Sequence, residues 1–225
     1  MSFAAAILAS ASTTFIQTLV KALALGSIYV MMALGFVIIF KGTQVLNFAA
    51  GALSMAGALF MSILVNDGGL PFLPFDNPLA PDPGETPGIA LWLTNLALAL
   101  VIAAIFGLVV ERLTIRPMIG QPLFAMAVIT LGVEIAVRPF NLDATATTAR
   151  SLSVPWGADS WTLSGAIIPK SYLVAMIAAA VAGTCVVLFY RSRLGIAMRA
   201  VAFDQEAAMA QGISTGRIFA MAWAI

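Results

Sequence analysis

Five long apolar segments dominate the hydrophobic pattern of this chain, and polar breaks of different lengths separate them. The segments run from about Ala22 to Phe40, Val45 to Val65, Ile89 to Val110, Pro122 to Pro139 and Ser171 to Tyr190. A helix of ~20 predominantly apolar residues crosses the hydrocarbon core of a bilayer. The pattern therefore predicts an all-α, polytopic membrane protein in which each of these segments is a spanning helix.

A sixth apolar segment begins at Ile218, and the sequence ends eight residues into it, at Ile225. A helix of that length is about 12 Å long, whereas the hydrocarbon core is ~30 Å thick. We therefore expect residues 1–225 to be a single transmembrane domain that is truncated after the start of a sixth helix and incomplete at its C-terminus.

The fourth segment is shorter than the others, because Pro122 and Pro139 bracket only sixteen residues. A helix of that length spans roughly 24 Å, and short or interrupted helices are common where transporters bind their solutes. It contains Thr130 and Glu134, and a carboxylate in a membrane segment is costly unless it faces protein or water. Glu134 also stands one turn before Arg138, so solute contact and a helical ion pair remain equally open.

The second segment is rich in small side chains, and Ala50, Ser54 and Ala58 recur in it at every fourth position. Helices in lipid associate through close backbone packing, which small side chains permit. We therefore expect this helix to be buried among others. Gln44 and Asn47 stand at its start, where they can cap the helix, bond to a neighbour or belong to a solute pathway.

Two longer polar stretches separate the apolar segments. Residues 66–88 are rich in proline and glycine and carry acidic residues without a lysine or arginine, which predicts a solvated loop. Residues 141–170 hold β-branched patches around a Pro-Trp-Gly turn, which predicts a small hairpin.

Lysine and arginine indicate the orientation, because they accumulate in cytoplasmic loops. With the N-terminus outside and the segments alternating, seven basic residues fall inside and four outside. The inside set is Lys41, Arg112, Arg116, Arg191, Arg193, Arg199 and Arg217, and the outside set is Lys21, Arg138, Arg150 and Lys170. We therefore predict an extracytoplasmic N-terminal segment over about residues 1–15 and a cytoplasmic loop over residues 191–217.

Composition restricts the chemistry. The chain is 61% hydrophobic, 9% charged and without a basic tail, which excludes a soluble domain and a nucleic-acid partner. It has no histidine, which removes histidine-ligated metals and most hydrolase mechanisms. Cys185 is the single cysteine and lies in an apolar run, as a core residue would. We expect no metal, no cofactor and no enzymatic activity, since Glu134 is the only acidic group inside the segments.

Three stretches carry a family resemblance. LGSIYVMMALGFVIIFKGTQVLNFAAGALSMAGA covers Leu25–Ala58, VERLTIRPM follows the third segment, and YRSRLGIAMRAVAFDQEAAMAQG follows the fifth. In this order they resemble the permease subunits of branched-chain amino acid ABC importers, the LivH-like family. The resemblance extends from about Gln17 to Ile225.

The resemblance implies an ABC importer transmembrane domain in the bacterial inner membrane, which moves solute by alternating access. It implies a second permease subunit of the same family, two ATP-binding subunits on the cytoplasmic side and an extracytoplasmic solute-binding protein, all within or beside membrane lipid. The chain has no phosphate-binding loop, so ATP hydrolysis would belong to the partners. The candidates for the solute pathway are Gln44, Asn47, Gly51, Thr130 and Glu134.

Relatives of this family carry branched-chain and other amino acids, urea or short amides. Where members often have a polar residue and a glutamate, this chain has Ala50 and Ala52. The expected solute is therefore a branched-chain or related amino acid, with urea or another small polar solute as the alternative. An ATP-independent carrier or channel is a further alternative.

The resemblance also implies that the loop over residues 191–217 couples the permease to an ATPase subunit. The matching residues are Glu206, Ala207, Ala208 and Gly212. The residues themselves predict one helix over about Ile196–Gln211, with Phe203, Ala207 and Ala210 on one face. Phe203 would be the large anchor in a groove of the ATPase, and Gly212 suits the left-handed position that ends a helix. An ordinary solvated amphipathic loop is the alternative.

Overall fold

The computed structural model describes residues 3–82, 85–145, 152–163 and 165–225. Within these residues five helices are long and apolar enough to cross a membrane: Ala11–Thr43, Ala50–Asp67, Ile89–Met118, Leu123–Asp143 and Lys170–Arg191. The predicted all-α, polytopic architecture is confirmed. Arg150, which the sequence places outside, lies beyond the described residues.

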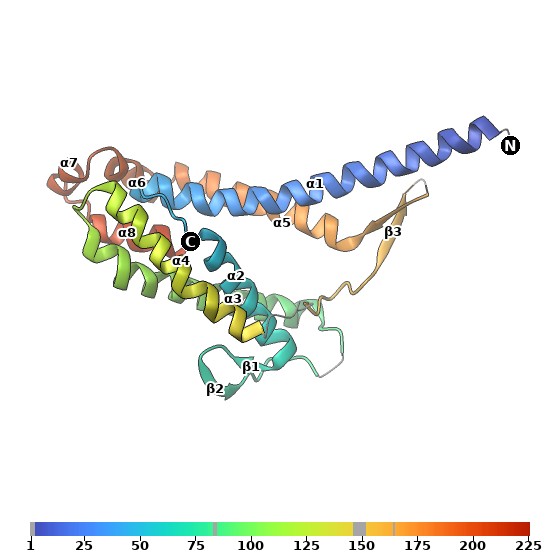
Figure 1. The fold of residues 1–225 in the computed structure, drawn as a ribbon, viewed down its shortest axis with the longest axis horizontal. Coiled ribbons are helices and arrows are strands. Elements are labelled where there is room, and N and C mark those ends of the chain that lie inside the picture. The colour runs from blue at the N-terminus through green and yellow to red at the C-terminus, as the bar shows by residue number, and fades with distance from the viewer. Residues whose placement is uncertain (1–2, 83–84, 146–151, 164) are drawn as a thin grey trace.

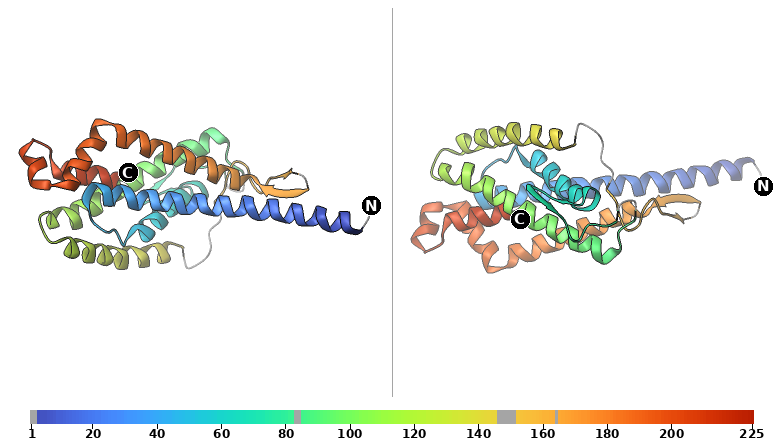
Figure 2. Two further views of the ribbon diagram at one scale, coloured as in Figure 1. Left: turned by 90° about the horizontal axis from the view of Figure 1, so that it is seen from above. Right: turned by 90° about the horizontal axis from the view of Figure 1, so that it is seen from below.

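Helix α1 (Phe3–Thr43) is far longer than the predicted first segment. Its 41 residues extend over about 60 Å at ~1.5 Å per residue, and its first half projects beyond the other helices (Figure 1). Helix α5 (Lys170–Arg191) lies side by side with α1 (Figure 2). A hairpin is present within residues 141–170, as the antiparallel strands β3 (Ser160–Leu163) and β4 (Ala166–Pro169), but both strands follow the Pro-Trp-Gly turn at residues 155–157 instead of flanking it. Strand β4 packs against α1.

Helix α2 (Ala50–Ser62) begins five residues later than predicted, and a single π-helical turn, η1 (Ile63–Asp67), follows it. Residues 44–49 form a non-helical connector instead. The Thr130 hydroxyl accepts a hydrogen bond from the Phe48 amide at 3.1 Å and lies 3.1 Å from the Leu46 carbonyl. The Phe48 bond satisfies a connector amide that a helix would have used internally, while the single Thr130 hydroxyl hydrogen is shared between the Leu46 carbonyl and the Ala127 carbonyl, 2.7 Å away.

The loop over residues 68–88 contains secondary structure, although the sequence predicted only a solvated stretch. It contains the strands β1 (Gly69–Leu70) and β2 (Leu73–Asp76). The Asn77 side chain then donates to the Leu64 carbonyl at 3.1 Å and to the Asn95 side chain at 2.8 Å. Asn77 and Asn95 are both buried, so they fasten this loop to η1 and to α3 (Ile89–Val110).

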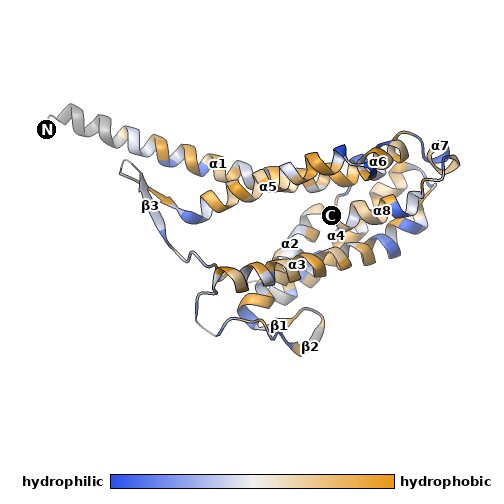
Figure 3. Cartoon of the chain, turned by 180° about the vertical axis from the view of Figure 1, so that it is seen from behind, coloured by the Kyte–Doolittle hydropathy of each residue, from blue (hydrophilic) through white to orange (hydrophobic). Residues whose placement is uncertain are grey.

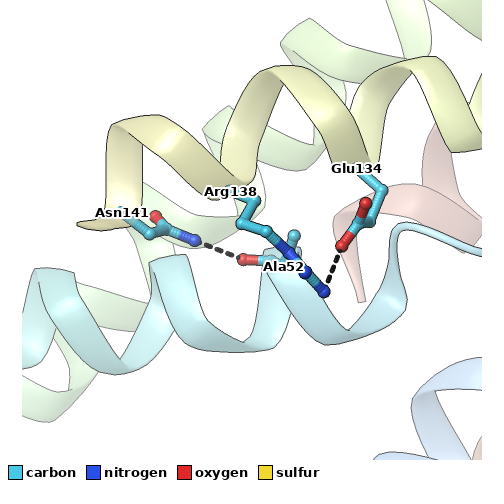
Figure 4. Close-up of polar contacts among 4 residues, drawn as sticks. All are labelled: Ala52, Glu134, Arg138 and Asn141. Atoms are coloured by element: carbon cyan, nitrogen blue, oxygen red, sulfur yellow. Dashed lines mark hydrogen bonds and ion pairs between the residues drawn. The ribbon is translucent and has the colours of Figure 1, made fainter. Parts of the chain in front are cut away.

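Helix α4 (Leu123–Thr145) has 23 residues and contains Pro139, so the expected sixteen-residue segment is wrong. Proline cannot donate to the carbonyl one turn earlier, but membrane helices tolerate this loss where neighbours hold the freed region. Here Asn141 is fully buried and donates to the Ala52 carbonyl of α2 at 2.8 Å (Figure 4). Helix α4 therefore continues past the proline while resting on α2.

Three short helices complete the chain: α6 (Arg193–Phe203), α7 (Gln205–Ala210) and α8 (Thr215–Ala224). Helix α8 lies between α1 and α3 and packs against the turn η2 (Glu111–Ile115), which η3 (Arg116–Met118) follows. A Cβ on Gly107 of α3 would collide with the main-chain carbonyl of Trp223. A Cβ on Gly42 of α1 would lie 3.0 Å from the side chain of Ala222. Glycine therefore permits a close approach of α8 to α3 and to α1.

The two ends of the molecule differ in character. Helices α6, α7 and α8 lie at one end, the N-terminus and the β3–β4 hairpin lie toward the other, and strands β1 and β2 lie at the lower edge of the view (Figure 1). Hydrophobic residues cover the long helices, and hydrophilic residues gather around α6 and α7 and at the foot of the β3–β4 hairpin (Figure 3). This arrangement agrees with alternating spans, and residues 191–217 lie at a single end.

Candidate functional site

A cavity of about 580 Å³ lies between α1, α2, α3 and the end of α8. Its wall is mainly apolar, with Met31, Leu53, Phe60 and Leu100 among the large side chains. Among its described lining residues none is charged, and Asn47 and Ser54 supply polar side chains. A space of this size, apolar with a few polar groups, is typical of a site for a small organic molecule.

The small side chains of α2 divide between two faces. Ala52 and Ala56 are buried in the main apolar core. Ala50 and Ser54 instead line the cavity. The helix is packed among others as the sequence predicted, but the Ala50–Ser54 row borders open space rather than another helix.

Two buried side-chain donors belong to the cavity wall. The Asn47 Oδ1 accepts from the Ala49 amide at 3.0 Å, so the residue closes the turn before α2. The Asn47 Nδ2 and the Trp223 Nε1 are both buried and have no hydrogen-bond partner within the described part of the chain. Unsatisfied buried donors are costly, although these two atoms are themselves covered and do not face the cavity directly.

The other four candidates for the solute pathway have different surroundings. Gln44 ends α1 in a left-handed conformation with φ of 57°, and its main-chain amide donates to the Phe40 carbonyl at 2.8 Å. Gly51 is exposed, with open space where a Cβ would stand. Thr130 is fully buried and holds the 44–49 connector. A role for these residues in solute passage stays a prediction.

Glu134 forms an ion pair with Arg138, one turn later on α4, with 2.7 Å between Oε1 and Nη2 (Figure 4). The glutamate side chain is 21% exposed and the arginine side chain 67%. Each charge therefore has a partner within a helix that crosses the membrane. The sequence left open whether Glu134 contacts solute or pairs with Arg138, and the structure contains the ion pair.

The loop over residues 191–217 folds as two helices, so the expected single helix over Ile196–Gln211 is wrong. The chain is extended at Asp204, with φ of −153°, which separates α6 from α7. The Asp204 carboxylate accepts from the amides of Glu206 at 2.9 Å and Ala207 at 3.0 Å. Aspartate is a preferred N-cap because it satisfies amides that a helix start leaves free. The break therefore creates a new, capped helix start.

The predicted coupling residues occupy both sides of this pair of helices. Phe203 is 94% exposed, and Glu206 and Ala207 are also exposed. Ala208 is buried against the core, which holds α7 on the body of the protein. The pair thus presents one large aromatic ring and a small alanine toward whatever lies beyond this end.

Gly212 ends α7 in the left-handed conformation that the sequence predicted, with φ of 81°. Its amide donates to the Met209 carbonyl at 2.9 Å, and the Ile213 amide donates to the Ala208 carbonyl at 3.0 Å. These two bonds form a Schellman motif. The motif turns the chain from α7 into α8.

Sequence reasoning missed Asn141, Asp204 and Trp223. Asn141 directly follows Pro139 and Phe140, and a carboxamide so close to an apolar run could have suggested an interhelical hydrogen bond. Asp204 stands two residues before Glu206, a spacing compatible with an N-cap. Nothing in the sequence around Trp223 signals that it borders a cavity.

Comparison with known proteins decides the family. The family model described as "Branched-chain amino acid transport system / permease component" matches residues 18–225. The chain belongs to this family. The match includes every element from the middle of α1 to the end of α8, and so it includes both the cavity and the α6–α7 pair.

Curated relatives agree with this assignment. The chain is 25% identical over 218 residues to the high-affinity branched-chain amino acid transport system permease protein LivH of Escherichia coli (strain K12). It is 25% identical over 221 residues to LivH of Salmonella typhimurium, and 24% identical over 221 residues to BraD of Pseudomonas aeruginosa. Each match covers 94% of this chain and 66% of the relative, so the chain spans slightly less than two thirds of their length. No solved structure matches.

Proposed function

We propose that this chain is the membrane-spanning permease subunit of an ATP-driven importer for branched-chain or related amino acids. A binding protein delivers the solute, which passes through the cavity between α1, α2, α3 and α8. Partner subunits hydrolyse the ATP. The names of LivH and BraD, both branched-chain amino acid permeases, support this class of solute.

The position of α8 is the observation that carries the proposal. Its first residue, Thr215, follows the Gly212 turn that ends α7, and its last turn lines the cavity with Ala222 and Trp223. Helix α8 thus joins the proposed ATPase-facing end to the cavity wall. Alternating access requires a movement at one place to change exposure at the other, and α8 supplies a direct connection.

The α6–α7 pair is the proposed contact with the ATP-binding subunits. Aromatic side chains at the centre of an interface contribute much of its binding energy, and Phe203 is almost wholly exposed. Ala207 is also exposed, and its small side chain leaves room for the partner surface. Two ATP-binding subunits, a second permease subunit of the same family and an extracytoplasmic binding protein complete the proposed assembly.

The proposed orientation places the N-terminus outside. The basic residues near α6 and α7, among them Arg191, Arg193 and Arg199, then face the cytoplasm, where such residues accumulate. The acidic loop with Asp67 and Asp76 then faces outward, as does the proposed extracytoplasmic segment over residues 1–15. The ATP-binding subunits and the α6–α7 pair are consequently on the same side.

Solute uptake tests this proposal. In a permease-null bacterial cell that supplies the partner subunits, the full-length permease that contains these residues should support ATP-dependent leucine uptake, and Ala207→Trp should abolish it by blocking the ATPase contact. Ala180→Trp, on an exposed part of α5, is the matched control and should leave uptake intact. Uptake that survives ATP depletion, or that Ala180→Trp and Ala207→Trp reduce equally, would contradict the proposal.

A urea- or amide-like solute is the second candidate, and the uncharged cavity favours it. Asn47 and Ser54 offer neutral hydrogen-bonding groups, and the described lining residues offer no charge for an ammonium or carboxylate group. Competition by urea and acetamide against leucine in the same uptake assay separates the candidates. Inhibition of leucine uptake by urea and acetamide would favour a urea- or amide-like solute over an amino acid.

A further inference from the structure

A second hollow, of about 420 Å³, lies on the outer side of α3 near the end that carries α6 and α7. Ile105, Leu108 and Val109 line it from α3, and Ala220 lines it from α8. It is separate from the solute cavity, whose lining includes Gly107 on the intervening face of α3. The proposed transport function makes no use of this hollow.

One face of α3 changes from apolar to basic along this hollow. Ile105, Leu108 and Val109 are 55%, 38% and 46% exposed. Arg112 and Arg116 continue the same three- and four-residue spacing through η2 into η3, and both line the hollow. The result is an apolar strip that ends at two guanidinium groups.

The two arginines are held differently. Arg112 is exposed, whereas Arg116 is partly buried. The Arg116 guanidinium lies so close to Gly216 that a Cβ there would be 2.9 Å from its Nη2. The start of α8 therefore positions Arg116 beside the hollow and restricts its freedom, which lowers the entropy cost of binding an anion.

Glu111 also lines the hollow, and its charge must be weighed against the arginines. It is 1% exposed, and Arg116 is near enough to attract it electrostatically. Because Glu111 is buried and Arg112 is exposed, the charge that the hollow presents to an incoming ligand is positive. An acidic headgroup is thus favoured over a cationic one.

We propose that this hollow binds one anionic phospholipid from the leaflet on the α6–α7 side. Arg112 and Arg116 hold its phosphate, since guanidinium groups bind phosphate through paired, charge-assisted hydrogen bonds. An acyl chain lies along Ile105, Leu108 and Val109. Basic pockets between membrane helices at the cytoplasmic side are a recognised kind of site for acidic headgroups.

Native mass spectrometry of the detergent-purified chain with added phosphatidylglycerol or phosphatidylcholine tests the proposal. We expect phosphatidylglycerol to bind more tightly than phosphatidylcholine, and Arg112→Gln to weaken it about tenfold. Arg112→Lys should keep part of the affinity, because the positive charge remains. Arg193→Gln on α6 removes an exposed basic residue outside the hollow and should change nothing.

The position of the acyl chain is tested with a phosphatidylglycerol that carries a photoreactive group in that chain. Crosslinks should fall on Ile105 to Val109 in preference to Ile177 and Val181, which are exposed on α5. Any of three results would overturn the proposed site. These are equal binding of phosphatidylglycerol and phosphatidylcholine, an equal loss of affinity in Arg112→Gln and Arg193→Gln, or crosslinks spread evenly over α3 and α5. Arg112 is exposed, so its replacement does not disturb the core.

Discussion

The side-chain amide of Asn141 donates a hydrogen bond of 2.8 Å to the main-chain carbonyl of Ala52, and this bond joins α4 to α2 beyond Pro139 (Figure 4). Replacement of Asn141 by leucine removes this bond between the two helices, although the Ala52 carbonyl keeps its hydrogen bond within α2. Interhelical hydrogen bonds in membrane proteins contribute about 1 kcal/mol. We therefore expect a lower midpoint of thermal unfolding in detergent. Ser54→Ala, whose hydroxyl bonds within its own helix, should leave the midpoint unchanged.

The contact between Gly107 and the Trp223 carbonyl leaves no space for a Cβ. Gly107→Ala should therefore destabilise the protein by about 1–3 kcal/mol, the usual cost of overpacking. Gly183→Ala is the control, because nothing lies within 4 Å of a Cβ at that position of α5. The control should be neutral or stabilising by up to about 1 kcal/mol. Similar unfolding midpoints for the two variants would contradict this packing.

Glu134 should face protein or water rather than lipid, because its side chain is mostly covered and paired with Arg138. We expect Glu134→Cys either to react with a water-soluble thiol reagent or to react with neither a water-soluble nor a lipid-soluble reagent. It should not react with the lipid-soluble reagent alone. The exposed Cys185 must first be replaced by serine. Labelling from lipid without any labelling from water would refute the placement.

Asp204 should determine where α7 begins. Asp204→Ala removes the acceptor for the Glu206 and Ala207 amides and should cost about 1 kcal/mol of local stability. Hydrogen exchange at these two amides should accelerate in that variant. Asp204→Asn keeps a capping oxygen and should preserve the slow exchange, so equal exchange in the two variants would mean that the cap has no effect.

Gly212 should be needed for coupling because of its left-handed conformation. Valine at this position should cost about 1–2 kcal/mol and displace α8 from α7. Under the proposed function, Gly212→Val should insert in the membrane yet lose solute-stimulated ATP hydrolysis. Asparagine tolerates the left-handed conformation, so Gly212→Asn should retain most of the stimulation. Loss of solute-stimulated ATP hydrolysis in both variants would mean instead that coupling requires the absence of a side chain at position 212.

Local sequence signals predicted the parts of this fold that depend on neighbouring residues. Segment hydropathy located the membrane helices, because burial in lipid depends on the composition of each segment alone. The composition of residues 141–170 predicted a hairpin, but the Pro-Trp-Gly turn did not locate it, because β3 and β4 both follow that turn. The Gly212 turn was also predictable, since few residues other than glycine adopt its conformation without strain.

The errors arose where distant contacts decide local structure. Helix α2 starts late because Thr130, 82 positions after Phe48, bonds the connector. Helix α4 continues past Pro139 while Asn141 bonds a carbonyl 89 positions away. The cavity depends on four helices at once, so periodicity within one segment could select Asn47 but not Trp223.

The close contact between the Trp223 carbonyl and Gly107 restricts how α8 can move relative to α3. A piston-like slide of one turn along α3 would bring that carbonyl to Ala103 or Glu111, each of which carries the Cβ that Gly107 lacks. Helices α3 and α8 therefore have a single mutual register. Under the proposed function, movement of α7 by an ATP-binding subunit would therefore tilt or rotate α3 and α8 together, and with them the cavity walls that these two helices form.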